Sequence, residues 1–267
     1  MAKVTSADGT TIAYDAWGEG PAVVVVGGAF NDRNTWADLA RGLADAGFTG
    51  VTYDRRGRGE SGDTAPYAVE REIEDLAAVV DEVGGGAVHA HGVSSGGALL
   101  LRAAAEGVGV RSLSVLEPPF RVPGAPPAPE RYVETLTGFI EAGDRSGLVE
   151  YFQRQVVGLP AEMVASFKGT QMWAWLEALA PTVVYDAHAL GGNDHSLPTE
   201  LLGRLDVPVL AVTSTGTAAP WMGQAAEAVA AAVPHGRFVR LEGGFHEVPT
   251  GVLVPALAAF YREGTTG

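Results

Sequence analysis

The sequence predicts an α/β fold, in which helices cover both faces of a mostly parallel sheet. Apolar runs such as Val23–Val26 are too short for a helix and too apolar for a half-exposed strand. Segments with helical spacing separate these runs, and in Glu70–Val83 the apolar residues fall on one face. Because strands and helices alternate along the chain, we expect parallel strands joined by crossover helices.

The first part of the chain contains this alternation without a break. A hairpin over residues 3–6 and 11–16 is predicted by Asp8-Gly9, a pair that favours tight turns. The elements that follow are, in order, strand Val23–Val26, helix Thr35–Ala46, strand Phe48–Tyr53, helix Glu70–Val83, strand Ala87–Ala90, helix Ser95–Glu106 and strand Arg111–Leu116.

The alternation is interrupted after the sixth strand. The proline-rich segment Pro123–Pro129 leads into short helical segments up to Leu205, among which Thr182–Tyr185 is a candidate strand. The pattern then resumes with strand Val207–Thr213, helix 221–233, strand 237–241 and helix 252–262. We therefore expect an eight-stranded core domain from residues 1–120 and 206–267, with a helical domain over residues 121–205 inserted in it.

Composition and charge argue against several classes of function. The chain has 267 residues and a net charge of −14, which disfavours nucleic acid or an anionic membrane as a partner. It contains no cysteine, so thiol chemistry, disulfides and cysteine zinc sites are excluded. The first residues lack the apolar core of a signal peptide, and no apolar run approaches the roughly 20 residues that cross a bilayer. We therefore expect a cytoplasmic protein.

The residues Gly92-Val93-Ser94-Ser95-Gly96 lie between a predicted strand and a predicted helix. This order is typical of a nucleophile elbow, G-x-S-x-G, whose spacing selects Ser94 rather than Ser95. The glycines are expected to leave room around a strained serine, which then lies at a helix N-terminus. The alternative is an ordinary tight turn with a serine that caps the helix.

Together with this elbow, three further stretches resemble the α/β-hydrolase family, and the resemblance covers residues 3–262. They are Gly27-Gly28-Ala29 with Trp36 downstream, Tyr53-Asp54-Arg55-Arg56-Gly57-Arg58-Gly59-Glu60-Ser61, and Gly243-Gly244-Phe245-His246. The resemblance implies the α/β-hydrolase fold with a cap domain inserted after strand six. It also implies serine chemistry that needs no cofactor and no metal. We expect Asp54–Ser61 to shape a neighbouring loop and to take no part in catalysis.

A serine hydroxyl needs a base, and histidine suits this role because it changes charge near neutral pH. Of six histidines, only His246 lies in a glycine-bearing loop directly after the last predicted strand. That loop opens at the same edge of the sheet as the elbow. The resemblance implies the same residue as the base.

The carboxylate that orients this histidine does not lie at the usual place. Most of the family carries an aspartate after the seventh core strand, but Thr213–Pro220 contains no carboxylate. Glu117 follows the sixth strand, and the branch that includes the zearalenone lactonases is similar in having its acid there. We therefore predict Glu117 as the acid. The alternatives are Asp186, Asp194 and Asp206.

The backbone N–H groups of Ala29 and Ser95 are the predicted oxyanion-hole donors, because one follows the third strand and the other opens the helix after the elbow. Aromatic side chains near the expected mouth predict a pocket for an apolar substrate. The predicted substrate-binding residues are Phe30, Phe120, Trp173, Tyr185 and Trp221. For each of them, packing in the protein core is the alternative.

These residues together predict a serine hydrolase that cleaves a carboxylic ester or lactone of an apolar small molecule through an acyl-enzyme intermediate. Carbon–carbon bond hydrolysis and cofactor-free perhydrolysis are alternatives on the same site. A small-molecule binding protein of this fold without turnover is a third hypothesis, since the usual late aspartate is missing.

Overall fold

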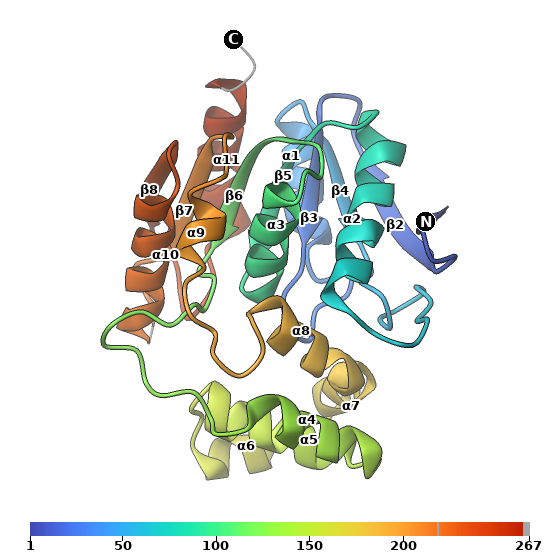
Figure 1. Ribbon diagram of the computed structural model, residues 1–267, viewed down its shortest axis with the longest axis vertical. Coiled ribbons are helices and arrows are strands. Elements are labelled where there is room, and N and C mark those ends of the chain that lie inside the picture. Colours follow the sequence, from blue (N-terminus) through green and yellow to red (C-terminus); the bar gives the residue numbers. More distant parts are fainter. Residues whose placement is uncertain (218, 264–267) are drawn as a thin grey trace.

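A computed structural model describes residues 1–217 and 219–263 of the protein and confirms the predicted sheet of eight mostly parallel strands (Figure 1). The strands are β1 (Ala2–Thr5), β2 (Thr11–Trp17), β3 (Ala22–Val26), β4 (Thr49–Tyr53), β5 (Val88–Val93), β6 (Val110–Leu116), β7 (Val209–Ser214) and β8 (Gly236–Leu241). They lie in the order β1-β2-β4-β3-β5-β6-β7-β8 across the sheet. The β1–β2 and β2–β4 pairs are antiparallel and all other pairs are parallel.

Helices cover both faces of the sheet, as the fully buried run of β3 predicts. Helices α1 (Ala37–Asp45) and α11 (Thr250–Glu263) pack with Val23 and Val25 on one face. Helices α2 (Val69–Gly84), α3 (Ser95–Ala105) and α10 (Pro220–Ala232) pack with Val24 and Val26 on the other. Successive side chains of a strand point to opposite faces, so a strand buried on both faces is apolar at every position.

The segment between β6 and β7 forms short helices, most of which lie at the carboxyl edge of the sheet, whereas the last one packs against α3 and α10 (Figure 1). They are α4 (Tyr132–Glu141), α5 (Arg145–Tyr151), a π-helical turn (Phe152–Val156), α6 (Ala161–Phe167), α7 (Gln171–Leu179), a 3₁₀ turn (Ala180–Thr182), α8 (Val183–Ala189) and α9 (Thr199–Leu202). Leu136, Val149, Trp173 and Leu176 belong to a separate hydrophobic cluster of this segment. The helical insertion therefore has a core of its own.

The predicted strand at Thr182–Tyr185 is wrong, because these residues end a 3₁₀ turn and begin α8. The pair Val183-Val184 has a high intrinsic preference for strands. However, Leu179, Val183 and Ala187 are all buried and are spaced four residues apart. This spacing places them on one side of a helical path, so burial in the insertion outweighs the local preference.

Six parallel strands, β4, β3, β5, β6, β7 and β8, end at the same edge of the sheet. Their following loops hold every residue that the sequence predicts for the reaction itself. Among the residues that the structure describes, no helix is long and apolar enough to cross a membrane.

Candidate active site

Ser94 is the turn between β5 and α3, and its backbone is strained. Its φ of 55° and ψ of −129° lie in a region that L residues rarely adopt. A hydrogen bond from Gly97 N to Ser94 O at 2.9 Å closes the turn, and one from Ser94 N to Leu116 O at 2.9 Å holds it against the end of β6. Helix α3 begins at the next residue, so Ser94 occupies the N-cap position at the positive end of the helix dipole.

The glycines of the elbow are needed for a different reason from the expected one. A Cβ on Gly92 would lie 2.5 Å from Gly97 Cα, and one on Gly96 would lie 2.3 Å from Val26 O. The clashes are thus with the backbone of α3 and β3 rather than with the serine side chain. The glycine that faces the serine is Gly28, where a Cβ would lie 2.9 Å from Ser94 Cβ.

His246 and Glu117 form a hydrogen-bonded pair at the carboxyl edge. The distance from His246 Nδ1 to Glu117 Oε2 is 2.7 Å. The carboxylate is fully buried, whereas the imidazole side chain is 26% exposed. A buried acid behind a partly exposed imidazole is the arrangement that holds a general base in one tautomer and orientation.

The end of β7 supplies donors to Glu117 in place of an acid of its own. Glu117 Oε1 accepts hydrogen bonds from Thr213 Oγ1 at 2.8 Å and from Ser214 N at 2.9 Å. Ser214 Oγ also donates to Gly244 O at 2.6 Å, which ties β7 to the loop of the histidine. Sequence reasoning missed Thr213 and Ser214, although hydroxyl residues at a strand end without a carboxylate were a readable signal.

These contacts keep Glu117 ionised. Burial raises the pKa of its carboxyl, but the hydrogen bonds from His246, Ser214 and Thr213 outweigh burial and lower the pKa below its ordinary value of 4.5. A carboxylate that stays charged at neutral pH is able to stabilise the imidazolium that forms during acyl transfer.

The three alternative acids have other partners. Asp186 is buried between Arg55 and Arg58. Asp194 accepts a hydrogen bond from the hydroxyl of Ser196. The side chain of Asp206 is 99% exposed and lies 3.5 Å from His235. The geometry therefore favours Glu117 over each of them as the partner of His246.

Backbone strain is concentrated at this edge. Ser94, Glu117 and His246 have φ values of 55°, 45° and 49°, and Phe30, next to Ala29, has a φ of 55°. Such conformations are costly for residues other than glycine and tend to occur at functional sites. Four of the six described non-glycine residues with positive φ are thus the three predicted catalytic residues and one residue of the predicted oxyanion loop, and the other two, Arg131 and His195, belong to the insertion.

The two predicted oxyanion donors lie on adjoining segments. Gly28, which precedes Ala29, approaches both residues of the elbow, since a Cβ on it would also meet Ser95 Oγ at 3.4 Å. Ser95 is the first residue of α3, where backbone N–H groups have no helical acceptor. Its side chain points elsewhere, because Ser95 Oγ donates to Asp186 Oδ1 at 2.7 Å.

The predicted substrate-binding residues do not form one group. Phe30 is buried edge-on against Phe152, and Trp173 donates from its indole N–H to Ser146 and Glu177. Both are buried in the hydrophobic cluster of the insertion, so a role of either side chain in substrate binding stays a prediction.

Tyr185 and Phe120 are also engaged in packing, whereas Trp221 is partly exposed in the first turn of α10. Tyr185 stacks on Tyr67 with a centroid distance of 3.7 Å, and its hydroxyl donates to Asp63 at 2.8 Å. Phe120 is buried in the core beneath α3 and borders a small pocket of about 50 Å³. Tyr185 and Phe120 thus both pack against other side chains of the protein.

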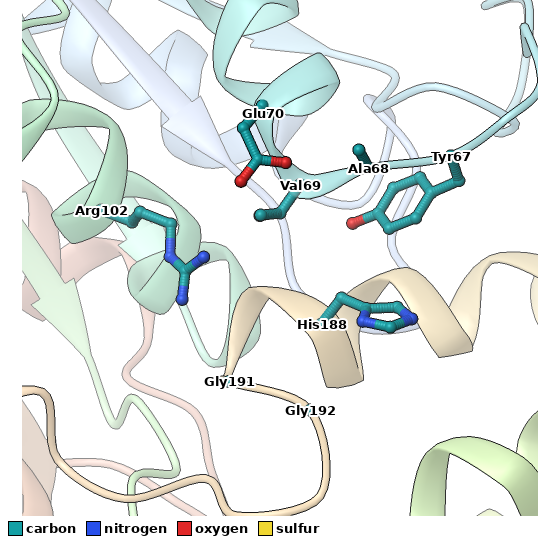
Figure 2. A pocket seen from close by; sticks show the side chains of 8 residues that line it. All are labelled: Tyr67, Ala68, Val69, Glu70, Arg102, His188, Gly191 and Gly192. Atoms are coloured by element: carbon teal, nitrogen blue, oxygen red, sulfur yellow. The ribbon is translucent and has the colours of Figure 1, made fainter.

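A larger pocket of about 470 Å³ opens between α2, α3 and α8 (Figure 2). Its lining comes from the start of α2, from Arg102 of α3 and from the end of α8 at His188. Neither Ser94 nor His246 is among its described lining residues. Burial lowers the pKa of His188, which favours the neutral imidazole.

The described residues contain no group of three or more His, Asp or Glu side chains that could hold a metal ion. His89 and His91 are fully buried in β5, where each Nδ1 lies within hydrogen-bond distance of a serine of β6. Burial lowers the pKa of His91 to about 3 and that of His89 to about 4. Burial thus favours the neutral form of both imidazoles, which pack inside the sheet.

A strained serine between a parallel strand and a helix, in a sheet of this order, defines the class of α/β-hydrolase folds. A sequence profile described as the alpha/beta hydrolase family matches residues 23–252, and the chain belongs to this family.

Known structures and curated relatives agree with this assignment. The chain is 42% identical to an alpha/beta hydrolase from Sphaerobacter thermophilus, with a TM-score of 0.90 over 97% of this chain and 100% of that one. A thermophilic esterase from Thermogutta terrifontis is 24% identical, with a TM-score of 0.71 over 99% of both chains, and shows the shared fold.

The similarity to curated proteins covers shorter stretches of the chain. The chain is 31% identical to a non-heme haloperoxidase from Rhodococcus erythropolis over 147 residues, which is 53% of this chain and 54% of that protein. The curated relatives that it matches are covered over 36% to 54% of their own length. Family membership and a hydrolase fold follow from these comparisons.

Proposed function

We propose that the protein is a serine hydrolase that cleaves a carboxylic ester or lactone through an acyl-enzyme intermediate. The observation that carries the proposal is the 2.7 Å pair of His246 and buried Glu117 at the sheet edge where the strained Ser94 lies. An alcohol, an imidazole and a carboxylate in these roles constitute the acyl-transfer triad.

In the proposed reaction, Ser94 Oγ attacks the carbonyl carbon while His246 takes the serine proton. The N–H groups of Ala29 and Ser95 donate to the oxygen that becomes negative, and Glu117 stabilises the imidazolium. His246 then protonates the departing alcohol, and the acyl group remains on Ser94. Water attacks this ester with His246 again as base, which releases the acid and restores the serine.

An apolar substrate is supported by the side chains next to the proposed machinery. Phe245, beside His246, is 50% exposed, so its ring is accessible to an apolar group of a substrate. Trp221 begins α10 close in sequence to the end of β7 and is partly exposed. A small ester or lactone with an apolar acyl or alcohol group is the substrate class that suits these residues. A cytoplasmic location stays a prediction from the sequence.

Two measurements test the proposal together. The purified protein is incubated with short-chain p-nitrophenyl esters and, separately, with a serine-directed fluorophosphonate. We expect turnover and stoichiometric labelling of Ser94, and both are expected to disappear in Ser94→Ala while its melting temperature stays near that of the wild type. A wild-type protein that shows neither turnover nor label would instead favour a binding protein of this fold.

Perhydrolysis is a second candidate, supported by the similarity to a non-heme haloperoxidase. In this reaction hydrogen peroxide replaces water in the attack on the acyl-enzyme, and a peracid leaves. Peracid formation from an ester and hydrogen peroxide, compared with hydrolysis of the same ester, decides between the two activities.

A further inference from the structure

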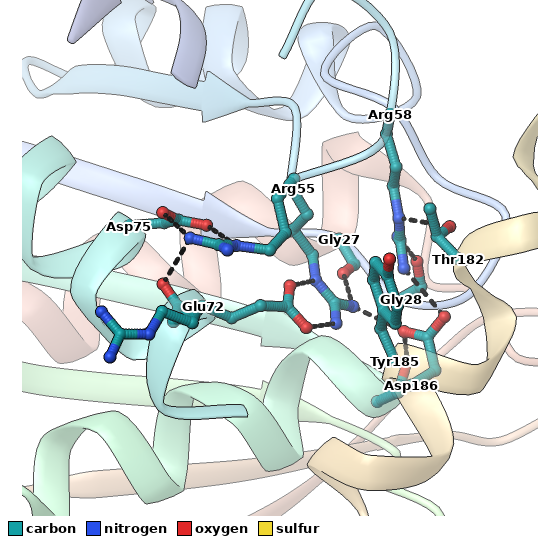
Figure 3. Close-up of polar contacts among 12 residues, drawn as sticks. Gly27, Gly28, Arg55, Arg58, Glu72, Asp75, Thr182, Tyr185 and Asp186 are labelled. Atoms are coloured by element: carbon teal, nitrogen blue, oxygen red, sulfur yellow. Dashed lines mark hydrogen bonds and ion pairs between the residues drawn. The ribbon is translucent and has the colours of Figure 1, made fainter. Parts of the chain in front are cut away.

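A cluster of four buried charged residues connects the loop after β4 with α2 and α8 (Figure 3). Arg55 forms a bidentate pair with Glu72, with distances of 2.6 and 2.7 Å. Asp186 of α8 bridges two arginines, at 2.5 Å from Arg55 Nη1 and 2.8 Å from Arg58 Nη2. Two positive and two negative side chains thus balance each other in the interior.

Three hydrogen bonds connect this cluster to both sides of the proposed oxyanion hole. Arg55 Nη1 donates to Gly27 O at 3.2 Å, and Arg58 Nη1 donates to Gly28 O at 2.6 Å (Figure 3). On the other side, Ser95 Oγ donates to Asp186 Oδ1 at 2.7 Å. The loop before Ala29 and the residue that carries the second donor are therefore tied to one carboxylate.

We propose that Asp186 is a positioning residue of the oxyanion hole, which sets the distance between the Ala29 and Ser95 N–H groups through Ser95 Oγ and the two arginines. This inference rests on the proposed hydrolase function. Because Asp186 comes from the helical insertion, docking of α8 on α3 completes the oxyanion hole. The insertion thereby contributes to stabilisation of the transition state.

The charge state of Asp186 suits this role. Burial raises the pKa of its carboxyl, but the charges of Arg58 and Arg55 and the hydrogen bond from Ser95 outweigh burial and hold the pKa below its usual range. An ionised carboxylate can accept from the serine and from both arginines at once, whereas a neutral acid would lose part of these contacts.

The loop after β4 also contains Arg56, whose buried ion pair serves as a matched control. Arg56 is paired with buried Asp75 at 2.7 and 2.8 Å, and its other donors reach Asp8 and Arg71 O. These partners belong to the β1–β2 turn and to α2, away from Gly27, Gly28 and Ser95. Removal of this pair is expected to cost stability without moving the oxyanion donors.

The test compares Ser95→Ala, Asp186→Asn and Asp75→Asn in ester turnover and thermal unfolding. Ser95→Ala keeps the backbone donor and removes one hydrogen bond, so we expect kcat to fall about 10-fold with KM within about twofold, at a near-normal melting temperature. Asp186→Asn is expected to lower kcat by about 10²-fold. Asp75→Asn is expected to lower the melting temperature and to leave kcat near the wild-type value.

Hydrogen exchange of the backbone over residues 26–31 provides a readout that does not depend on turnover. It is expected to be faster in Asp186→Asn and unchanged in Asp75→Asn. If exchange over these residues is equally fast in the wild type, Asp186→Asn and Asp75→Asn, the positioning role is overturned. A wild-type kcat in Ser95→Ala overturns it as well. A kcat loss in Asp75→Asn equal to that in Asp186→Asn also overturns it. If the wild-type protein shows neither turnover nor a fluorophosphonate label, the proposed hydrolase function is contradicted. The exchange rates of residues 26–31 then still show whether Asp186 orders this loop.

Discussion

The imidazole Nδ1 of His246 lies 2.7 Å from Oε2 of Glu117, although the two residues are separated by 129 positions in the chain. The pair joins the ends of β6 and β8, and β7 lies between these strands in the sheet. Thr213 and Ser214 of β7 fill the gap by donating to the other carboxylate oxygen. An acid on β6 therefore reaches a histidine that follows β8, with the longer glutamate side chain spanning one strand.

Replacement of the acid tests this pair. Glu117→Gln keeps the shape but removes the charge that stabilises the imidazolium, so we expect kcat to fall about 10²–10⁴-fold. Ester turnover under saturating substrate provides the measurement. Glu242→Gln, an exposed residue in the loop of the histidine, serves as control and is expected to retain activity. Retained activity in Glu117→Gln together with loss in Asp194→Asn would transfer the role to Asp194.

A methyl group at Gly28 tests the packing of the oxyanion loop on the elbow. The new Cβ would lie 2.9 Å from both Ser94 Cβ and Val93 O, so one of the two segments must shift. We expect Gly28→Ala to lower kcat by about 10²-fold or more, because displacement of the donors by about 1 Å is costly. The rate of fluorophosphonate labelling should fall in parallel.

The control for this substitution is Gly138→Ala in α4, where an added Cβ meets nothing within 4 Å. Alanine favours a helix over glycine by about 1 kcal/mol, so this variant is expected to be as active as the wild type and slightly more stable. Wild-type activity in Gly28→Ala would show that the loop adapts and that close approach to Ser94 is not required.

Substitution of Trp173 distinguishes a structural role of this side chain from a role in substrate binding. The side chain is 3% exposed and packs in the cluster of the insertion, so Trp173→Ala should destabilise the protein by about 3–5 kcal/mol in denaturant unfolding. Trp175→Ala, on the same helix but 36% exposed, is expected to cost about 1 kcal/mol or less. A large increase in KM of Trp173→Ala with unchanged stability would instead support the predicted substrate-binding role.

Stability at acidic pH depends on His91. Burial lowers its folded-state pKa to about 3 from the ordinary 6.5, so the unfolded chain binds a proton more readily. The neutral imidazole of His91 therefore contributes fully to the stability of the fold above about pH 6.5, and this contribution is lost progressively as the pH falls toward 3. We expect His91→Asn to be less stable at neutral pH but to lose less stability between pH 6.5 and 4.

Urea unfolding at several pH values measures this difference. His235→Asn serves as the control, because the His235 side chain is 58% exposed. The control is expected to follow the wild-type profile. An equal slope of stability against pH in His91→Asn and the wild type would mean that another group carries the acid sensitivity.

Sequence patterns determined the order of strands and helices along the chain, the place of the insertion, and the position of Ser94 at a turn between a strand and a helix. These features depend on local chemistry: apolar runs specify buried strands, and the spacing of glycines around a serine specifies a turn that other residues cannot enter. The prediction of Glu117 depended on the absence of a carboxylate after β7, which is also visible along the chain.

Only the tertiary structure decided what lies around these residues. Val183 and Val184 are helical because burial in the insertion outweighs their preference for strands, and Trp173 is buried in the hydrophobic cluster of that insertion. The link from Asp186 to Ser95 joins positions 91 apart in the chain, and no local pattern encodes it. Contacts between distant segments depend on how complete elements pack, so the sequence shows which residues are available and the fold determines which of them meet.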